Sequence, residues 1–457
     1  MGKKVHLIAI GGSAMHNMAL ALHEKGFEVT GSDDEINEPS KSRLKTAGIL
    51  PPETGWFPDK ITPDISAVIL GMHAREDNPE LKKARELNLK IYSYPEYIYE
   101  ATKDKTRIVV GGSHGKTTIT AMILHVMNYH HIETDFMVGA QLEGFDTMVR
   151  LTNTAKYAVI EGDEYLASPI DRRPKFHLYK PNIAILSGIA WDHINVFPTF
   201  EIYTEQFTKF IELIEPNGHL IYCGEDAVLM ELSQKAVNKT ITKTSYLVPS
   251  NEIKNGVTYL IRDNERIPLQ IFGDHNLMNL NGARMVCNKI GLTDDQFYLA
   301  IQSFKGAAKR LELVYKSDNF NFYKDFAHSP SKLKATTSAV KKQFPDRRII
   351  ACMELHTFSS LNEDFLKEYM DSMNLADEAI VYFNPHTIVH KKLKEITVDQ
   401  VKQAFNRSDL KVFTKSSEVT EYLLTKSWNN KVLLMMSSGN FDGVDFNDLA
   451  QKLNARE

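Results

Sequence analysis

The chain has 457 residues, of which 43% are hydrophobic and 25% charged, and its formal net charge is −4. This length exceeds what a single hydrophobic core supports, so at roughly 150 residues per domain we expect about three domains. The weakly acidic balance excludes a global basic field for nucleic acid or an anionic membrane surface. No apolar run is long enough for a signal sequence or a membrane span, so we expect a cytoplasmic protein.

The first block of the sequence, residues 1–101, alternates short β-type runs with helical stretches, which predicts a Rossmann-like α/β domain. Its first strand ends in Gly11, Gly12 and Ser13, and its second ends in Ser32 and Asp33. An acidic residue some 20 positions after a glycine turn lies beside a nucleoside in such a domain. The full Gly-x-Gly-x-x-Gly fingerprint is missing, so a mononucleotide or UDP-type ligand is at least as plausible as a dinucleotide. The strands are predicted at residues 5–10, 27–30, 67–70 and 90–92, and the helices at 15–25 and 78–87.

The second block, residues 102–305, opens with a phosphate-binding loop. A β-branched strand ends in Gly112-Ser113-His114-Gly115-Lys116-Thr117-Thr118, and a helix is expected from about Ala121. Glycines let backbone N–H groups approach an anion, Lys116 would reach the terminal phosphates, and Thr117 would offer a hydroxyl to Mg²⁺. Val110 stands where the strict Walker spacing needs glycine, so the loop is a shorter variant. Further strands are expected at 157–161, 183–186 and 219–223, and a long helix at 278–290.

Polar side chains follow two strands of this block. Glu161, Asp163 and Glu164 come at one strand end, where ligands bind in open α/β sheets. A carboxylate there, with Thr117 and phosphate oxygens, would suit Mg²⁺; a solvated acidic turn is the alternative. Asp192 and His193 follow the next strand and could supply a second metal ligand or orient a phosphate, although a lone histidine is more often structural.

Two later segments also fit nucleotide binding. Asn276 and Asn279, one turn apart at a helix start, can cap that helix or hydrogen-bond an adenine edge. Arg310 lies near the start of a third block, residues 306–457, from which an arginine could reach the γ-phosphate. That block alternates again, which predicts a second Rossmann-like domain with strands near 320–324, 348–353, 378–382 and 432–435. Asp325 and His328 follow its first strand.

Six segments, in this order, resemble the Mur ligases, the ATP-dependent amide-forming enzymes of peptidoglycan assembly. The family pattern has a Gly-Lys-Thr loop, a Glu-rich strand end, Asp-His, His-Asn-x-x-Asn, Phe-x-Gly followed by Arg-x-Glu, and Asp-x-x-His-x-Pro. The corresponding residues here are 112–118, 161–164, 192–193, 275–279, 304–312 and 325–330. The resemblance implies three α/β domains: a UDP-sugar domain, a central ATPase domain and an amino-substrate domain.

The resemblance also implies roles for particular residues. Catalysis would fall to Lys116, His193 and Arg310, and Mg²⁺ to Thr117, Glu161 and His193. ATP would be bound by Gly112, Ser113, His114, Gly115, Lys116, Thr117, Thr118, Asn276, Asn279, Arg310 and Asp325. UDP-sugar binding would use Gly11, Gly12, Ser13, Ser32, Asp33 and His73, and the amino substrate would contact His328 and His356.

Within the family, His114 and the segments at 11–15 and 77–80 look like the branch that acts on UDP-N-acetylmuramate. One activity of that branch adds L-alanine, and the other attaches the recycled tripeptide L-Ala-γ-D-Glu-meso-diaminopimelate. Thr357 stands where the alanine enzymes carry an arginine, and the segments at 171–177 and 436–441 look more like the tripeptide enzyme. We therefore expect the tripeptide, with L-alanine as the alternative.

Departures from the family pattern leave the amino-substrate pocket open. The Glu354 position looks more like the tripeptide enzyme, but the run Glu354-Leu355-His356-Thr357 differs from that enzyme's usual Glu-Pro-Arg-Ser, and Ser329 replaces a second histidine. Lys209 lies near the position of the lysine that some Mur ligases carbamylate, but we do not predict this modification. Two other classes remain alternatives: a P-loop kinase, and a UDP-sugar sensor without turnover. The kinase leaves the third domain unexplained, and the sensor would not require Lys116, Thr117, Glu161 and His193 together.

Overall fold

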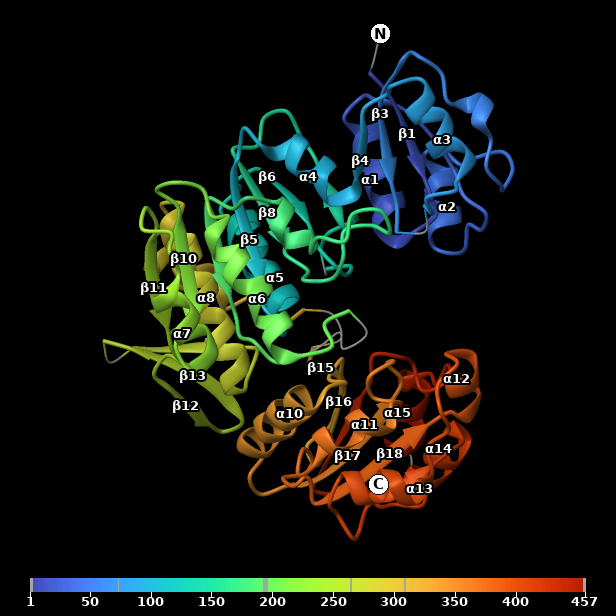
Figure 1. Ribbon diagram of the computed structural model, residues 1–457. Helices are drawn as coiled ribbons and strands as arrows, with labels where there is room; N and C mark the ends of the chain where they lie inside the picture. Colours follow the sequence, from blue (N-terminus) through green and yellow to red (C-terminus); the bar gives the residue numbers. More distant parts are fainter. Residues whose placement is uncertain are drawn as a thin grey trace. The chain divides into compact units, whose positions relative to one another are not determined.

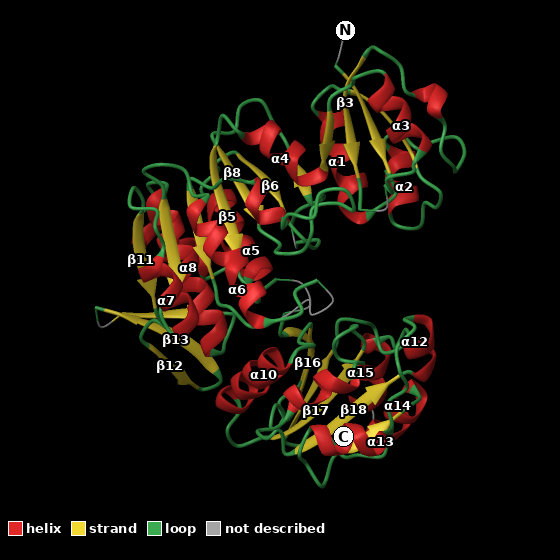
Figure 2. Cartoon of the chain, viewed as in Figure 1, coloured by secondary structure: helices red, strands yellow, loops and turns green. Residues whose placement is uncertain are grey.

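The computed structural model of the protein describes residues 3–72, 74–142, 144–191, 196–263, 265–307 and 310–454. Contacts within the chain divide it into two compact units. The first holds most of the chain up to residue 247 together with 282–300, and the second holds 248–281 and 301 onward. Figure 1 labels many of the helices and strands of both units, and Figure 2 shows helices flanking their sheets. No helix among the described residues is both long and apolar enough to cross a membrane.

The first unit begins with a four-stranded parallel sheet in the order β2-β1-β3-β4, and the Rossmann-like architecture expected here is confirmed. The predicted helix at 78–87 is shorter in the structure because Asn78 is its N-cap: the side-chain oxygen accepts from the backbone N–H of Glu80 and Leu81 at 2.9 and 3.1 Å. The strands are β1 (Lys4–Ile8), β2 (Glu28–Ser32), β3 (Ile65–Leu70) and β4 (Ile91–Ser93). The helices are α1 (Ser13–Glu24), α2 (Ser40–Thr46), α3 (Pro79–Glu86) and α4 (Tyr94–Thr102).

The same unit contains a seven-stranded sheet in the order β11-β10-β9-β5-β8-β6-β7, parallel except for the edge strand β7. The central position of β5 places the phosphate loop in the middle of the sheet's carboxyl edge, beside the ends of β8 and β9. The strands are β5 (Thr106–Gly111), β6 (Thr134–Met137), β7 (Val149–Arg150), β8 (Tyr157–Glu161), β9 (Ile183–Leu186), β10 (His219–Cys223) and β11 (Thr242–Tyr246). The helices are α5 (Lys116–Tyr129), α6 (Phe200–Glu212), α7 (Ala227–Lys235) and α9 (Asp294–Ile301), and α8 (Asp274–Lys289) passes from the second unit into the first after Asn281.

Two predicted helix starts were late by four or five residues. Helix α5 begins at Lys116 rather than near Ala121, because Gly115 takes a φ of +76° as its N-cap. Two threonines in the first turn lower helix propensity, but they are buried, so tertiary contacts override that preference. Helix α8 begins at Asp274 rather than Met278.

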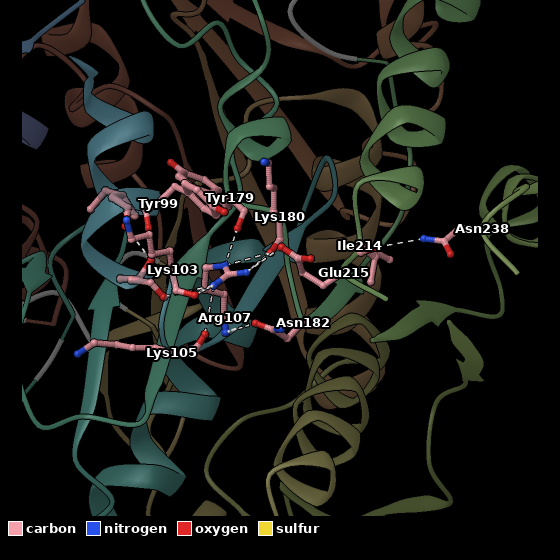
Figure 3. Close-up of polar contacts among 12 residues, drawn as sticks. Tyr99, Lys103, Lys105, Arg107, Tyr179, Lys180, Asn182, Ile214, Glu215 and Asn238 are labelled. Atoms are coloured by element: carbon pink, nitrogen blue, oxygen red, sulfur yellow. Dashed lines mark hydrogen bonds and ion pairs between the residues drawn. The ribbon is translucent and has the colours of Figure 1, made fainter. Parts of the chain in front are cut away.

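A buried arginine organises the amino end of β5 (Figure 3). The Arg107 side chain is only 3% exposed, and its guanidinium donates to backbone carbonyls from both the end of α4 and the segment that precedes β9. Its shortest bonds reach Lys103 O at 2.7 Å, Tyr179 O at 2.9 Å and Lys180 O at 2.9 Å. An ion pair with Glu215 at 3.2 Å completes its environment. Arg107 therefore ties several loops together at the end of the strand opposite the phosphate loop.

The second unit contains a three-stranded antiparallel sheet that the sequence analysis did not predict, formed by β12 (Asn251–Lys254), β13 (Val257–Arg262) and β14 (Glu265–Leu269). Asn255 and Gly256, with φ of +52° and +71°, form the turn between β12 and β13. Asn-Gly is a strong hairpin signal, so this turn was predictable. The sheet is joined to α10 (Pro330–Gln343) by a hydrogen bond from Thr258 Oγ1 to Gln343 Oε1 at 3.0 Å.

The rest of the second unit is a six-stranded sheet in the order β15-β16-β20-β17-β18-β19, parallel except for β15. Alternate residues of β17 enter two different hydrophobic clusters, so both faces of the sheet are buried, as expected for a Rossmann-like domain. The strands are β15 (Glu312–Lys316), β16 (Phe320–Asp325), β17 (Arg348–Leu355), β18 (Glu378–Phe383), β19 (Lys411–Phe413) and β20 (Lys431–Met436). Besides α10, the helices are α11 (Glu363–Leu366), α12 (Pro385–His390), α13 (Val398–Ala404), α14 (Ser416–Leu424) and α15 (Phe446–Asn454).

Candidate active site

The loop between β5 and α5 has the backbone of a phosphate cradle. Gly112 and Gly115 have φ of +125° and +76°, a region that favours glycine. A Cβ on Gly112 would also lie 2.9 Å from the backbone nitrogen of Ser187, which directly follows β9. Ser113 N donates to Gly188 O at 2.9 Å, so the loop is attached to the neighbouring strand end. Both glycines are therefore required by the local geometry.

Lys116 points back over this loop toward a buried carboxylate. Its ammonium donates to Gly112 O at 2.7 Å and to Glu164 Oε2 at 2.6 Å. The Lys116 side chain is 14% exposed and that of Glu164 is 1% exposed. Burial lowers the pKa of Lys116, but Glu164, Asp163 and Glu161 together raise it above its ordinary value, so the ammonium stays charged. The structure thus holds a permanent positive charge at the phosphate loop.

The hydroxyl of Thr117 and the carboxylate of Glu161 lie together beside the loop. Thr117 Oγ1 donates to Glu161 Oε1 at 2.9 Å, while Glu161 Oε2 accepts from Gly139 N at 2.9 Å. Glu161 and Glu164 are buried, which contradicts a solvated acidic turn for these two carboxylates. Asp163 is more exposed and pairs with Lys175 at 2.6 Å. The expected contact between Thr117 and Glu161 is therefore present.

Two histidines were expected at the phosphate loop, and the structure describes one of them. His193, with Asp192, lies outside the described residues. His114 is half-buried, and a Cβ on Gly188 would lie 2.5 Å from its ring, so the loop and the segment after β9 pack without space for a side chain there. Ser187 Oγ donates to His114 O. Among the described residues, no group of three or more His, Cys, Asp or Glu could hold a metal ion by itself. The Thr117–Glu161 pair does fit Mg²⁺, which commonly combines one or two protein oxygens with phosphates and water.

The expected UDP-sugar residues gather at the carboxyl edge of the β1–β3 sheet. Asp33 Oδ2 accepts from Gly11 N at 2.7 Å, and Gly12 is the N-cap of α1, whose first residue is the exposed Ser13. Burial raises the pKa of Asp33 to about 6, with a smaller contribution from Asp34. Ser32 is buried near Asp33. His73 lies outside the described residues.

In the second unit, Asp325 at the end of β16 is engaged by its own domain. Its two carboxylate oxygens accept from Leu311 N and Ala327 N, each at 2.7 Å. The guanidinium of Arg310 lies 4.5 Å from the centre of the Phe326 ring, and His328 Nδ1 contacts Phe326 O at 2.8 Å. Arg310, on the segment before β15, thus contacts the segment at the end of β16 that carries Asp325 and His328, at the carboxyl edge of the sheet.

Of the two alternatives for Asn276, helix capping or an adenine contact, the structure excludes capping. Asn276 is inside α8, and its amide donates to Phe272 O at 2.9 Å instead of accepting from the first turn. Asn279 is buried one turn later on the same helix. Neither residue is the N-cap, because the helix begins at Asp274.

A buried cluster at the ends of β17 and β20 surrounds Glu354, which is 1% exposed. Glu354 Oε2 accepts from Phe441 N at 2.9 Å and from Ser437 Oγ, and Glu354 Oε1 lies 3.5 Å from His356 Nδ1. Burial raises the pKa of Glu354, but these hydrogen bonds lower it more, so the net direction is downward. A Cβ on Gly439 would lie 2.8 Å from both Glu354 and His356. Ser437 and Gly439 were not predicted as site residues.

A cavity of about 370 Å³ opens beside this cluster, between β15, β16, β20 and the start of α15. Its lining combines charged, amide, hydroxyl and aromatic groups, including Lys324, Asp325, Ser437, Asn440 and Phe441. Lys324 pairs with Glu312, also in the lining, at 2.8 Å. Thr357, at the position where the alanine enzymes carry arginine, accepts from Ser360 N at 3.0 Å through its hydroxyl.

Comparison with known proteins gives three consecutive family matches. The Mur ligase family catalytic domain matches residues 4–106, the Mur ligase middle domain matches 110–287, and the Mur ligase glutamate ligase domain matches 309–439. The UDP-N-acetylmuramate–L-alanine ligase of Caldicellulosiruptor bescii is 31% identical, over 83% of each chain. The enzyme of the same name from Aquifex aeolicus is 28% identical, over 92% of this chain and 96% of the relative. These names agree with the L-alanine alternative rather than with the tripeptide.

Solved structures share the fold over nearly the whole chain. A UDP-N-acetylmuramate-alanine ligase from Thermotoga maritima has a TM-score of 0.69 at 20% identity, covering 99% of this chain and 98% of that one. A murein peptide ligase from Psychrobacter arcticus has a TM-score of 0.63 at 23% identity, covering 100% and 98%. From the family matches and the 31% identity, the chain belongs to the Mur ligase family of ATP-dependent, amide-bond-forming ligases.

Proposed function

We propose that this ligase activates the carboxylate of UDP-N-acetylmuramate with ATP and joins it to the amine of an amino substrate. The observation that carries the proposal is the phosphate loop, where Lys116 is held beside Glu164 and Thr117 contacts Glu161. Similarity to named UDP-N-acetylmuramate ligases supports the sugar substrate. A cytoplasmic location and independence from nucleic acid and membranes remain predictions.

The proposed chemistry begins with attack of the muramyl carboxylate on the γ-phosphorus of ATP, which releases ADP and forms an acyl phosphate. A free carboxylate is a poor electrophile, so this activation must precede attack by an amine. The amine then adds to the acyl carbon, and the tetrahedral intermediate expels phosphate and loses a proton to leave an amide. Lys116 would stabilise charge on the transferring phosphoryl group. Thr117 and Glu161 would hold Mg²⁺, which when bound neutralises phosphate charge. Roles for His193 and Arg310 in this step remain proposals.

L-alanine is the amino substrate that the comparisons favour. The curated relatives named above are alanine ligases, and they align with most of the chain. The mixed charged and amide lining of the cavity beside β20 would suit a small zwitterion. His328 and His356 lie on the same edge of the sheet and are the proposed neighbours of the amino substrate.

Two specific observations make the tripeptide a second candidate. Thr357 and its turn replace the arginine that would bind the carboxylate of alanine, and Glu354 is buried beside His356. The similarity to a murein peptide ligase structure agrees with this candidate at the level of the fold alone.

One assay separates these candidates. The purified protein is incubated with ATP, Mg²⁺ and UDP-N-acetylmuramate, and receives L-alanine or the tripeptide in parallel. The mass of the UDP-linked product identifies the amine that was joined. Phosphate release that needs both the sugar nucleotide and an amine supports ligation. Release without any amine would instead support a kinase-like reaction, and binding without release would support a sensor.

A further inference from the structure

Behind the phosphate loop, three buried side chains form a continuous hydrogen-bonded path. Ser113 Oγ lies 2.8 Å from Tyr203 OH, and Tyr203 OH lies 2.9 Å from Glu164 Oε1. Ser113, Tyr203 and Glu164 are 6%, 0% and 1% exposed. They come from the loop, the first turn of α6 and the segment after β8. Three separate elements therefore meet at the phosphate loop through this path, which we call the Ser113–Tyr203–Glu164 relay.

The direction of each hydrogen bond follows from the number of protons available. Tyr203 has one hydroxyl proton, which it donates to the Glu164 carboxylate, so it must accept from Ser113. Ser113 Oγ in turn accepts from Ala190 N at 2.9 Å. The other oxygen of Glu164 accepts from Lys116. Donation thus runs from the backbone after β9 through Ser113 and Tyr203 to Glu164, and Lys116 donates to the same carboxylate from the other side.

This arrangement leaves the Lys116 ammonium able to bind a phosphate oxygen. Two of its three N–H groups are engaged by Gly112 O and Glu164, partners that the structure describes, and the third remains for a phosphate oxygen. Hydrogen bonds in a buried chain polarise one another, so the Tyr203 hydroxyl affects how firmly Glu164 holds Lys116. We propose that Tyr203 and Glu164 are positioning residues, which aim the Lys116 ammonium and the phosphate loop at the transferring phosphoryl group. This inference rests on the proposed role of Lys116.

The first test removes only the hydroxyl, by Tyr203→Phe, which keeps the buried ring. The matched control is Tyr179→Phe, because Tyr179 is also fully buried in this unit but its hydroxyl has no hydrogen-bond partner in the described structure. We expect kcat of Tyr203→Phe to fall roughly 10- to 100-fold, the size expected for a hydrogen bond to a charged group. The KM for UDP-N-acetylmuramate should stay within about twofold, because that ligand is expected elsewhere. Equal kcat values for Tyr203→Phe and Tyr179→Phe would overturn the proposal.

Two further variants distinguish positioning from a general loss of structure. Ser113→Ala interrupts the same relay at another point, so the double variant with Tyr203→Phe should lose less than the product of the single losses. Ser113→Thr retains a hydroxyl and should lose less activity than Ser113→Ala. Multiplicative losses in the double variant would contradict a shared path.

Glu164→Gln keeps the size of the side chain but removes the charge that holds Lys116, so its kcat should fall at least as much as that of Tyr203→Phe. A kcat close to wild type for Glu164→Gln would count against the relay. Affinity for a fluorescent ATP analogue supplies a readout that needs no amino substrate: Tyr203→Phe should weaken it, and Tyr179→Phe should not. If wild type released no phosphate with any amine, the proposed function would fail while this binding comparison would still test the relay.

Discussion

Replacing Arg107 by methionine tests whether the buried guanidinium stabilises the first unit. Methionine approximates the length of the arginine side chain but has no N–H donor. It would leave three carbonyl oxygens, those of Lys103, Tyr179 and Lys180, without bonds that are now 2.7 to 2.9 Å long. It would also leave Glu215 without its cation. Arg107→Met should therefore destabilise the unit without touching the phosphate loop at the other end of β5.

The expected loss of unfolding free energy follows from the cost of each polar group that loses its hydrogen-bond partner. A buried acceptor that loses its donor costs about 1–3 kcal/mol, and water recovers part of this wherever it can enter. Removing one partner of a buried charge network typically costs about 3–5 kcal/mol in total. Since Arg107 is 3% exposed, we take that range for the loss of unfolding free energy. For a unit of this size each kcal/mol corresponds to about 2–4 °C, which gives a fall in Tm of roughly 6–20 °C.

Wild type, Arg107→Met and Arg107→Lys are unfolded by heat and by urea. The first unfolding transition is used to compare the stability of the three proteins. Lysine retains the charge but has three donors instead of five, so its loss should be intermediate. Specific activity at 25 °C, corrected for the folded fraction, should be close to wild type for both variants. A loss below about 1 kcal/mol for Arg107→Met would refute the reasoning, because it would mean that water replaces the guanidinium at little cost.

Three further predictions concern the site itself. Lys116→Ala should reduce kcat by at least about 10³-fold in a phosphate-release assay, as expected for a charge that stabilises phosphoryl transfer; Lys209→Ala, at a half-exposed ion pair with Glu205, is the control and should retain activity. Gly112→Ala should weaken ATP binding, measured by calorimetry, because its Cβ would lie 2.9 Å from Ser187 N. The control is Gly26→Ala, because Gly26 also has a positive φ but a Cβ there would meet no atom within 4 Å. Equal effects of the two substitutions on ATP binding would contradict a role for crowding at Gly112. The pKa of Asp33 is raised to about 6 in the folded protein, so folding favours the protonated carboxyl. The stability that this contributes is lost as pH rises through about 6. Asp33→Asn should therefore gain stability relative to wild type as pH rises through that value, and a difference in Tm that is independent of pH would refute this.

The apolar strands and the phosphate loop could be predicted because each depends on residues close in sequence. Continuous β-branched runs identified the strands that lead to Gly11, Gly112 and Glu161, and parallel topology then places such strand ends on one edge of a sheet. Helix α5 was predicted to start too late because threonine is a poor helix former in isolation. The Ser113–Tyr203–Glu164 relay was not predictable, because Tyr203 is 39 residues from Glu164 and 90 from Ser113. Tyr203 lies on the buried stripe of α6 with Phe207 and Phe210, so its pattern indicates only a core position.

The buried cluster around Glu354, at the proposed amino-substrate site, was hard to predict because it depends on strand order. The last strand of the chain, β20, inserts between β16 and β17 at the centre of the sheet, which brings Ser437 to Glu354 although 83 residues separate them. Nothing in the local sequence of β20 indicates a central position, since every buried parallel strand has the same apolar pattern. Once β20 is central, its following loop must pass directly over Glu354 and His356, and only a residue without Cβ fits at Gly439. Strand order therefore determines which groups form the proposed amine site. If that proposal holds, a substitution in the loop after β20 should change amine selection more than one at Thr357, whose hydroxyl is already used within its own turn.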